Sequence, residues 1–489
     1  MRYLLGIDVG TTGTKTILFS EDGAQLGQAY CPYETASEQL GWSEQNPLDW
    51  WNAVVTTVRQ VCRDPEIAQN VAGISLSTQG GTTVPVDAEY QPVRPAIVWN
   101  DHRCRKEHEE FLQEFGSADA MYQKTGWDLE YGMNALAIRW LRANEPENFQ
   151  KTAWFLSVPD YISVKMTGLR KIDPSNTGIN ELGNVRAGGY DAEILRFAGI
   201  TEAQLPEIVP SGTPIGKLTP AAAAELGLTT ETVLMAGAHD QYAVALGAGA
   251  CGDGDTLIGS GTCWVVTRIS DKPDFDSGLC QSVAAVPHKW GSIWSLSSGG
   301  VCLEWWRKHL TNDEQGNLIS YDTINQEVAA RKAAEDGLFF YPFSGQTGNG
   351  TDFQRASFLG LDLSHDKYHL ARAVMEGVAM QIVWILDAFP GQSGGLKLAG
   401  GASKSKLWCQ MVADIAGKPV IVPHTADLAC VGAAILAGVG TGIFADAADG
   451  YKRMAIPEDV IAPDPQKTAM YQEKLRQYQQ GARLLGGFL

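Results

Sequence analysis

Residues 6–15, GIDVGTTGTK, place one aspartate, two glycines and three threonines within seven positions. The stretch lacks the Gly-Lys-Ser/Thr ending of a P-loop, and the helical period that follows a Rossmann turn is also missing. It is followed instead by the β-branched run TKTILFS, the hairpin signal Glu21-Asp22-Gly23 and a short strand from Ala24 to Tyr30. We therefore expect the glycines to lie in a turn between two strands.

Such a turn has the chemistry of a phosphate site. Glycine permits positive φ, so successive amides can face one concavity and bind phosphate oxygens. Further donors come from the side chains that follow Asp8 in this turn, Thr11, Thr12, Thr14 and Lys15. Asp8 itself would repel a bare phosphate, and Mg²⁺, which binds carboxylates together with phosphates, would resolve the conflict. A tight hairpin that Asp8 merely caps remains the alternative.

A similar turn occurs in the second half of the chain. TLIGSGTCWVVTRI at 256–269 resembles LLGIDVGTTGTKTILF at 4–19, because both read as strand, Gly/Thr turn and strand. The second turn, Gly261-Thr262, would offer amide and hydroxyl donors to the same kind of ligand. Two related domains, each with a phosphate-binding turn beside a shared cleft, explain this internal repeat.

Asp240 lies in GAHDQ, directly after the apolar LMAG and near the expected domain junction. Phosphoryl transfer to a hydroxyl needs positioning, charge neutralisation and a carboxylate that accepts the hydroxyl proton. Small neighbours would let a substrate approach this carboxylate closely. A helix N-cap is the alternative role for an aspartate in this place.

Length and composition limit the remaining possibilities. At 489 residues the chain exceeds what one hydrophobic core normally serves, so two domains are expected. The formal net charge of −18 argues against nucleic acid or an anionic membrane as partner. The nine cysteines are scattered without zinc spacing, and the first residues are not those of a signal peptide, so we expect reduced thiols in a cytoplasmic protein.

The periodicity of the chain predicts the elements that hold these residues. Helical periods cover 47–64, 104–116, 134–150, 367–388, 403–417 and 466–485, and strands cluster in 1–30, 71–100 and 256–300. The apolar run 378–386 is too short to cross a bilayer and predicts a buried helix. His365 and His369 are four apart without the glutamate of HExxH, which favours a solvated pair. Residues 236–254 are dense in small side chains, so we place the boundary near 243–252, with domains at 1–246 and 247–489.

Six ordered segments resemble the FGGY carbohydrate kinase family, within the sugar-kinase, actin and Hsp70 superfamily. They are GIDVGTTGTK, WSEQNPLDWW at 42–51, AIVWNDHRC at 96–104, AGAHDQ at 236–241, GSGTCW at 259–264 and LAGGASKSKLWCQMVADIAGKPV at 398–420. Within that family, the WSEQNP and WND segments are most similar to those of the xylulose kinases. The resemblance covers nearly the whole chain. It implies an α/β fold with two ribonuclease-H-like domains around a deep catalytic cleft, an ATP-dependent sugar kinase, and often a homodimer.

The resemblance also implies roles for individual residues. Asp240 would be the general base, Gln241 an acceptor contact, and Asp8 with Asp240 the carboxylates for Mg²⁺. The implied nucleotide contacts are Thr11, Thr12, Gly13, Lys15, Gly261, Thr262, Gly300, Glu304, Gly400, Gly401 and Ser405. Gly400-Gly401 would let adenine and ribose lie against the backbone before a helix from Ser403 to Ile415.

The acceptor site is where the chain departs from the family pattern. The strand SLSTQGGTTVPVD (75–87) matches around Gln79, but Gly80-Gly81 replace the Met-His of xylulose kinases and the Arg-Glu of glycerol kinases. These glycines suggest a wide floor without side chains. Asp101 would bind sugar hydroxyls, or would cap the next helix.

The sequence therefore predicts a kinase that transfers the ATP γ-phosphoryl group to a ketose, most similar to the xylulose kinases. Kinases for another ketose, a polyol or glycerol remain alternatives. A non-enzymatic actin-like or Hsp70-like ATP-binding protein is a further rival, although GAHDQ and the strand at 75–87 would then have no role. An acyl-phosphate-forming kinase would need an arginine cluster, which the sequence does not show.

Overall fold

A computed structural model gives the fold. It describes the chain except residues 312–315, 333–336, 347–351, 354, 390–393, 426 and 486–489. The chain forms two compact units, and each unit consists of three segments. Unit 1 contains Met1–Cys251, Ile269–Ser292 and Asp427–Ile456, and unit 2 contains Gly252–Arg268, Ile293–Ala426 and Pro457–Leu489.

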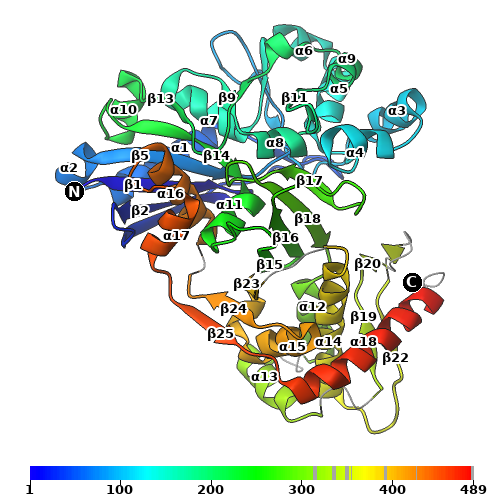
Figure 1. Cartoon of the computed structure of the whole chain (residues 1–489). Coiled ribbons are helices and arrows are strands. Elements are labelled where there is room, and N and C mark those ends of the chain that lie inside the picture. Colours follow the sequence, from blue (N-terminus) through cyan, green and yellow to red (C-terminus); the bar gives the residue numbers. More distant parts are fainter. Residues whose placement is uncertain are drawn as a thin grey trace. The chain divides into compact units, whose positions relative to one another are not determined.

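Unit 1 is built on a six-stranded mixed sheet in the order β13-β14-β5-β1-β2-β3 (Figure 1). Its strands are β1 (Tyr3–Val9), β2 (Gly13–Ser20), β3 (Gln25–Pro32), β5 (Val71–Thr78), β13 (Pro214–Lys217) and β14 (Val233–His239). β1 is antiparallel to β2, as expected for two strands joined by the Gly/Thr turn, and parallel to β5. β2 is antiparallel to β3, as the hairpin signal at residues 21–23 predicts. Thr78 of β5 is in register with both Val9 of β1 and His239 of β14, so these strands end at one edge of the sheet.

Short strands and helices complete unit 1. The strands are β4 (Glu44–Gln45), β6 (Val84–Val86), β7 (Ala96–Ile97), β8 (Trp154–Leu156), β9 (Lys171–Ile172), β10 (Gly183–Asn184), β11 (Gly189–Tyr190), β12 (Glu207–Ile208) and β17 (Cys280–Val283). The helices are α1 (Pro47–Val61), α2 (Pro65–Gln69), α3 (Arg105–Phe115), α4 (Asp119–Thr125), α5 (Asn134–Asn144), α6 (Pro146–Lys151), α7 (Val158–Thr167), α8 (Pro174–Ile179), α9 (Ala192–Ala198), the 3₁₀ turn η1 (Glu202–Gln204), α10 (Pro220–Leu226), α11 (Asp240–Gly247), α16 (Leu428–Gly440) and α17 (Ala447–Met454).

Local sequence explains most of these boundaries. Asn46 caps α1 by accepting a hydrogen bond from the Leu48 amide, and Pro47 follows in the first turn, as the sequence predicts. The single helix predicted over 134–150 is wrong, because the chain breaks at Glu145 and restarts as α6. Pro146 causes the break, since its ring disfavours helical backbone at the residue before it.

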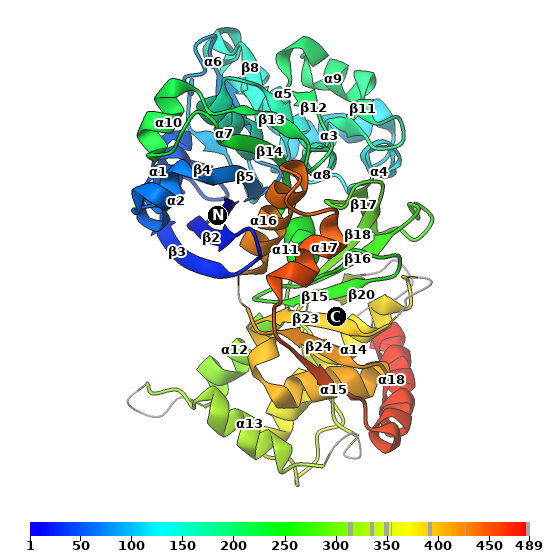
Figure 2. The same ribbon diagram turned by 60° about the vertical axis from the view of Figure 1, so that its left-hand side comes forward.

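Helix α16 packs against β1, β5 and α11, at the centre of unit 1 (Figures 1 and 2). The contact is close enough to require glycine: a Cβ added to Gly6 would lie 1.9 Å from the Cys430 carbonyl oxygen. A Cβ added to Gly432 would lie 1.9 Å from the Ala243 carbonyl oxygen. A segment near the C-terminus is therefore an integral part of the first sheet's packing.

Unit 2 repeats the strand pattern of unit 1. β15 (Thr256–Ser260) pairs antiparallel with β16 (Trp264–Ser270) and parallel with β23 (Leu396–Gly400), which pairs parallel with β24 (Val420–Pro423) and then antiparallel β25 (Glu458–Ile461). The order β25-β24-β23-β15-β16 thus matches β13-β14-β5-β1-β2 in the direction of every pairing, although β25 follows β24 in the chain whereas β13 precedes β14. The structure confirms the internal repeat predicted from the two Gly/Thr turns.

The other strands outside unit 1's sheet are β18 (Trp290–Leu296), β19 (Phe339–Tyr341), β20 (Gly345–Gln346), β21 (Asp352–Phe353) and β22 (Ser357–Leu359). The helices of unit 2 are α12 (Gly300–Leu310), α13 (Tyr321–Ala329), α14 (Lys367–Leu386), the 3₁₀ turn η2 (Ala402–Lys404), α15 (Lys406–Ala416) and α18 (Pro465–Leu485). Among the described residues only α14 is long and apolar enough to cross a membrane, and 83% of its apolar window is buried inside the protein. It is the core helix predicted from the run at 378–386.

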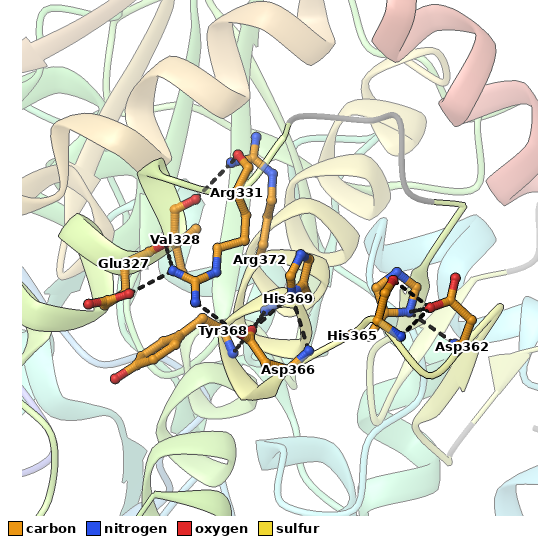
Figure 3. A network of polar contacts seen from close by, with 10 residues as sticks. Glu327, Val328, Arg331, Asp362, His365, Asp366, Tyr368, His369 and Arg372 are labelled. Carbon is orange, nitrogen blue, oxygen red and sulfur yellow. Dashed lines mark hydrogen bonds and ion pairs between the residues drawn. The ribbon is translucent and has the colours of Figure 1, made fainter.

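A polar network surrounds the beginning of α14 (Figure 3). Asp366 caps the helix and accepts a hydrogen bond from Arg331, which also pairs with Glu327. His369 lies 2.9 Å from the Asp366 carboxylate, and the rings of His365 and His369 are 5.3 Å apart. His365 Nδ1 accepts a hydrogen bond of 3.1 Å from the Asp362 amide, and its side chain is only 3% exposed, so the expectation of a solvated pair is wrong for His365.

Candidate active site

The shared edge of β1, β5 and β14 in unit 1 collects the carboxylates singled out by sequence. Asp8 near the end of β1 accepts a hydrogen bond of 2.7 Å from Ser77 Oγ on β5. Burial raises the pKa of Asp8 to about 7, and the negative charges of Asp240 and Asp427 act in the same direction. Asp8 and Asp240 therefore lie near enough to repel each other, and a cation would relieve that repulsion.

The carboxylates at this edge fit Mg²⁺ that also binds water and phosphate, rather than a metal ion whose ligands all come from the protein. Within the described residues, no group of three or more histidine, cysteine, aspartate or glutamate side chains is placed to hold a metal ion. Mg²⁺ usually takes only one or two carboxylates and completes its shell with water and phosphate oxygens. The desolvated Asp8 carboxylate beside the charge of Asp240 is consistent with that mode.

Lys15 on β2 forms an ion pair with Asp427, which precedes α16. Burial works in the other direction, but the hydrogen bond and charge of Asp427 raise the pKa of Lys15, so the amine stays protonated. The ion pair joins residues more than 400 positions apart, and the local sequence around either residue does not predict it. The Lys15 ammonium, which the sequence predicts as a phosphate contact, is thus paired with the Asp427 carboxylate.

The first Gly/Thr turn occupies residues 10–13 and is closed by a hydrogen bond of 3.1 Å from the Gly10 amide to the Gly13 carbonyl. Neither Gly10 nor Gly13 has positive φ, so the backbone reason given for these glycines is wrong. An added Cβ at Gly13 would instead lie 2.5 Å from the hydroxyl of the exposed Tyr30, whose ring would have to move. The Thr12 side chain is exposed at the tip of the turn.

Asp240 is the first residue of α11, and His239 rather than Asp240 holds the N-cap position. Its side chain is 33% exposed, and its Oδ1 atom lies 3.1 Å from His239 Nε2. Gln241 Nε2 donates to the same oxygen at 3.2 Å. A helix N-terminus stabilises nearby negative charge, and both side-chain neighbours lie at the same oxygen of this carboxylate.

Gln79 directly follows β5, is buried, and connects the strand end to the first turn. Its Oε1 accepts a hydrogen bond of 3.1 Å from the Thr11 hydroxyl, and its Nε2 donates to Gln45 Oε1 at 3.0 Å. Thr11 also accepts a hydrogen bond from the Trp99 indole at 3.1 Å. A predicted phosphate residue and a predicted sugar residue therefore contact each other.

Gly80 and Gly81 do not form the open floor expected from sequence. Both are buried. A Cβ added to Gly80 would lie 2.5 Å from Ile179 Cγ2 and 2.8 Å from His239 Cδ2, and one added to Gly81 would lie 2.2 Å from Met133 Sδ. Side chains from α8, β14 and the segment before α5 fill the space that the glycines leave.

Asp101 is fully buried, and both of its carboxylate oxygens accept hydrogen bonds. Its two oxygens accept hydrogen bonds from the Arg103 guanidinium at 2.9 and 2.7 Å and from the Ser43 amide at 2.6 Å. Arg103 in turn pairs with Glu44 and lies 3.7 Å from the Trp42 ring centroid. The WSEQNP and WND segments thus form one buried cluster, and a direct sugar contact by Asp101 would have to displace Arg103.

The second Gly/Thr turn lies in unit 2 between β15 and β16, with Gly261 and Thr262 both exposed. The turn contacts the start of α12: the Gly300 amide donates to the Gly261 carbonyl and the Val301 amide to the Thr262 carbonyl, each at 3.2 Å. A Cβ added to Gly300 would lie 2.3 Å from the Gly261 carbonyl oxygen. The Gly261-Thr262 turn and the start of α12, some forty residues apart in the sequence, are therefore joined by backbone hydrogen bonds.

Glu304 lies one turn further along α12 and accepts hydrogen bonds from Tyr321 at 2.6 Å and Arg307 at 3.2 Å. Partial burial opposes them, but these bonds and the positive charge of Arg307 lower the pKa of Glu304. It is an anion at neutral pH, already paired with cations.

The Gly400-Gly401 pair adjoins the same turn, because Gly400 is in register with Ser260 at the end of β15. Gly400 has φ of +104°, and an added Cβ would lie 2.8 Å from the Ser260 carbonyl. The expected helix begins at Lys406 rather than Ser403, after the 3₁₀ turn η2. Ser405 is its N-cap, accepting from the Trp408 amide and donating to Asn325 at 2.7 Å.

Several residues of this region were not expected from sequence. Gly80 and Gly81 pack against Met133, Ile179 and His239, and Lys15 pairs with Asp427. His239 alone carried a local signal, since it precedes Asp240 in GAHDQ. The others come from distant segments that single-sequence patterns do not connect.

Comparison with known proteins gives the geometry a family context. Residues 3–247 match the model of the N-terminal domain of the FGGY family of carbohydrate kinases, and residues 256–441 match its C-terminal domain. A probable L-xylulose kinase of Pasteurella multocida is 31% identical, with 98% of each chain covered. A gluconokinase of Bacillus subtilis is 29% identical over 90% of this chain and 88% of its own.

Among solved structures, xylulose kinase from Rhodospirillum rubrum is 26% identical with a TM-score of 0.91, covering 100% of this chain and 99% of that chain. The two family models and this structure confirm the predicted α/β fold class of the sugar-kinase, actin and Hsp70 type.

Proposed function

Because this chain belongs to the FGGY family of carbohydrate kinases, we propose that it transfers the γ-phosphoryl group of ATP to a hydroxyl of a ketose, with a pentulose such as D-xylulose as the first candidate. One observation carries the proposal for this site: Asp8 and the partly exposed Asp240 both lie at the edge where β1, β5 and β14 end, and the charge of Asp240 acts on Asp8. Such edges are the usual ligand sites of α/β sheets.

In the proposed reaction the acceptor oxygen bonds to the γ-phosphorus while the bond from that phosphorus to the β,γ-bridging oxygen breaks and ADP leaves. Asp240 accepts the hydroxyl proton, and Lys15 helps to neutralise the phosphates. Asp8 and Asp240 would hold Mg²⁺, which supplies charge neutralisation to the phosphates when bound. Thr11, Thr12 and Gly13 in unit 1 contribute donors of the first turn.

Unit 2 supplies the remaining nucleotide contacts in this proposal. The exposed Gly261 and Thr262 are candidates for phosphate oxygens. Gly300 adjoins that turn and Glu304 lies one helical turn further along α12. Gly400 with Gly401 leaves backbone bare of side chains where adenine and ribose can lie. Ser405 would act mainly as a helix cap beside the nucleoside, because its hydroxyl already bonds Asn325.

For the acceptor, Gln79, Gly80, Gly81, Asp101, Asp240 and Gln241 define the proposed site. A pentulose is favoured because a probable L-xylulose kinase matches the chain almost end to end. Gluconate is the second candidate, since a gluconokinase is nearly as similar. Side chains already occupy the space beside Gly80 and Gly81, so a bulky acceptor is not expected to fit there.

A coupled ADP-release assay over pentuloses, hexuloses, gluconate, polyols and glycerol tests the proposal. We expect the highest kcat/KM with a pentulose and no turnover without Mg²⁺. Preference for gluconate or glycerol would reject the pentulose assignment while keeping the kinase. Failure with every acceptor, combined with ATP-dependent light scattering, would instead favour a filament-forming ATP-binding protein.

The proposal also places the enzyme in the cytoplasm, and the structure is compatible with this because all nine cysteines are free thiols. Size-exclusion chromatography with light scattering decides between a monomer and the homodimer that the family resemblance suggests.

A further inference from the structure

His239, the last residue of β14, is held rigidly in unit 1. Only 5% of the residue is exposed, and its backbone amide donates to Ser175 Oγ at 2.9 Å. Ser175 in turn donates to the buried Asp173, which caps α8. The backbone of His239 is therefore fixed by a buried polar chain.

The imidazole ring is confined as firmly as the backbone. Trp127 and Tyr242 meet it edge to face, with ring centroids 6.0 and 5.9 Å away. Gly80, two residues after the end of β5, leaves room for the ring, because a Cβ there would come within 2.8 Å of the ring carbon Cδ2. Any side chain at position 80 would have to push the ring or Ile179 away.

This confined ring reaches the Asp240 carboxylate. His239 Nε2 lies 3.1 Å from Asp240 Oδ1, which is within ion-pair distance. Gln241 donates to the same Oδ1 at 3.2 Å. Within the described residues the other ring nitrogen, Nδ1, is buried without a hydrogen-bond partner, so the ring's one polar contact is with Asp240.

We propose that His239 is a positioning residue for Asp240. By holding Oδ1 together with Gln241, it presents Oδ2 to the acceptor hydroxyl, and Gly80 is required because it clears the space for the ring. The inference rests on the proposed role of Asp240 as general base.

A pair of variants separates this role from simple packing. His239→Leu fills similar space without a donor, whereas His239→Gln can place its amide Nε2 near the lost nitrogen. We expect His239→Leu to lower kcat by about 10²-fold, as a misplaced catalytic group does, with KM for the acceptor within a few-fold and an unchanged Kd for ATP. His239→Gln should recover most of kcat. Equal losses in both variants, or a loss confined to KM, would overturn the inference.

Asp240→Asn measured in parallel keeps the two hypotheses apart. If Asp240→Asn stays active, both the proposed role of Asp240 as general base and the positioning role of His239 are rejected. If Asp240→Asn is inactive but His239→Leu turns over normally, only the positioning role is wrong.

A second arm tests the part played by Gly80. In an Ile179→Ala background, which removes the contact at 2.5 Å, the contact of a new Cβ with His239 remains. Gly80→Ala should then lower kcat when His239 is present but add little to His239→Leu, since both changes act through one ring. Fully additive losses would contradict a route through His239.

Discussion

At the scale of single residues, Gly81 shows how the site region is closed. Its φ of +65° is unfavourable for other residues, and its amide donates to Asn180 Oδ1 at 3.1 Å. The Met133 sulfur occupies the position that a Cβ would need. The segment between β5 and β6 is therefore fixed by side chains from other segments, and Gly81 is a structural requirement.

Gly81→Ala should lower the free energy of unfolding by about 1–3 kcal/mol, because it combines backbone strain with overpacking. Urea denaturation measures this loss. In a Met133→Ala background the same Gly81→Ala change should cost less, because the clash with the Met133 sulfur is gone. An unchanged midpoint for Gly81→Ala would show that Met133 does not fill this space.

At the scale of elements, α16 depends on glycines for its close contact with β1 and α11. Gly6, Gly247 and Gly432 each face a backbone carbonyl that a Cβ would approach to 1.9 Å. Backbone cannot rotate away as a flexible side chain can, so these contacts resist enlargement.

Gly432→Ala should therefore destabilise the protein by roughly 1–3 kcal/mol in thermal or urea unfolding. Gly189→Ala is the matched control: Gly189 in β11 has no neighbour within 4 Å of an added Cβ, so this change should be nearly neutral. Similar effects of both substitutions would refute the close packing of α16.

Sequence patterns predicted the elements better than their partners. The hairpins around residues 10–13 and 261–263 and the helices beginning near Pro47, Arg105 and Lys367 follow from turn residues, caps and periodicity. Pro146 marks the break between α5 and α6, which helical periodicity alone does not predict. The packing of Met133 on Gly81, the pairing of Lys15 with Asp427 and the burial of Asp101 under Arg103 depend on long-range contacts that periodicity does not encode.

At the scale of the whole molecule, the two units carry the same strand pattern, and each has an exposed threonine in its first hairpin turn. Thr12 occupies the turn after β1, and Thr262 the turn after β15. We interpret these turns as the two phosphate-binding turns of one kinase.

Thr12→Val and Thr262→Val should each weaken MgATP binding, because a hydroxyl donor is lost in each turn, while sugar binding remains nearly intact. Isothermal titration calorimetry with MgATP and, separately, with the preferred acceptor measures both. Normal nucleotide affinity in both variants would exclude a role for the paired turns.

The most direct test of the account is the turnover of Asp240→Asn with the preferred acceptor. Asparagine keeps the shape of the side chain but removes the proton acceptor, so kcat should fall by about 10²–10⁴-fold, the usual contribution of a positioned base. Thermal unfolding and ATP affinity should stay near wild type, and Asp8→Asn should instead raise the Mg²⁺ concentration needed for half-maximal activity. If well-folded Asp240→Asn retained more than about a tenth of wild-type kcat, Asp240 would not be the general base.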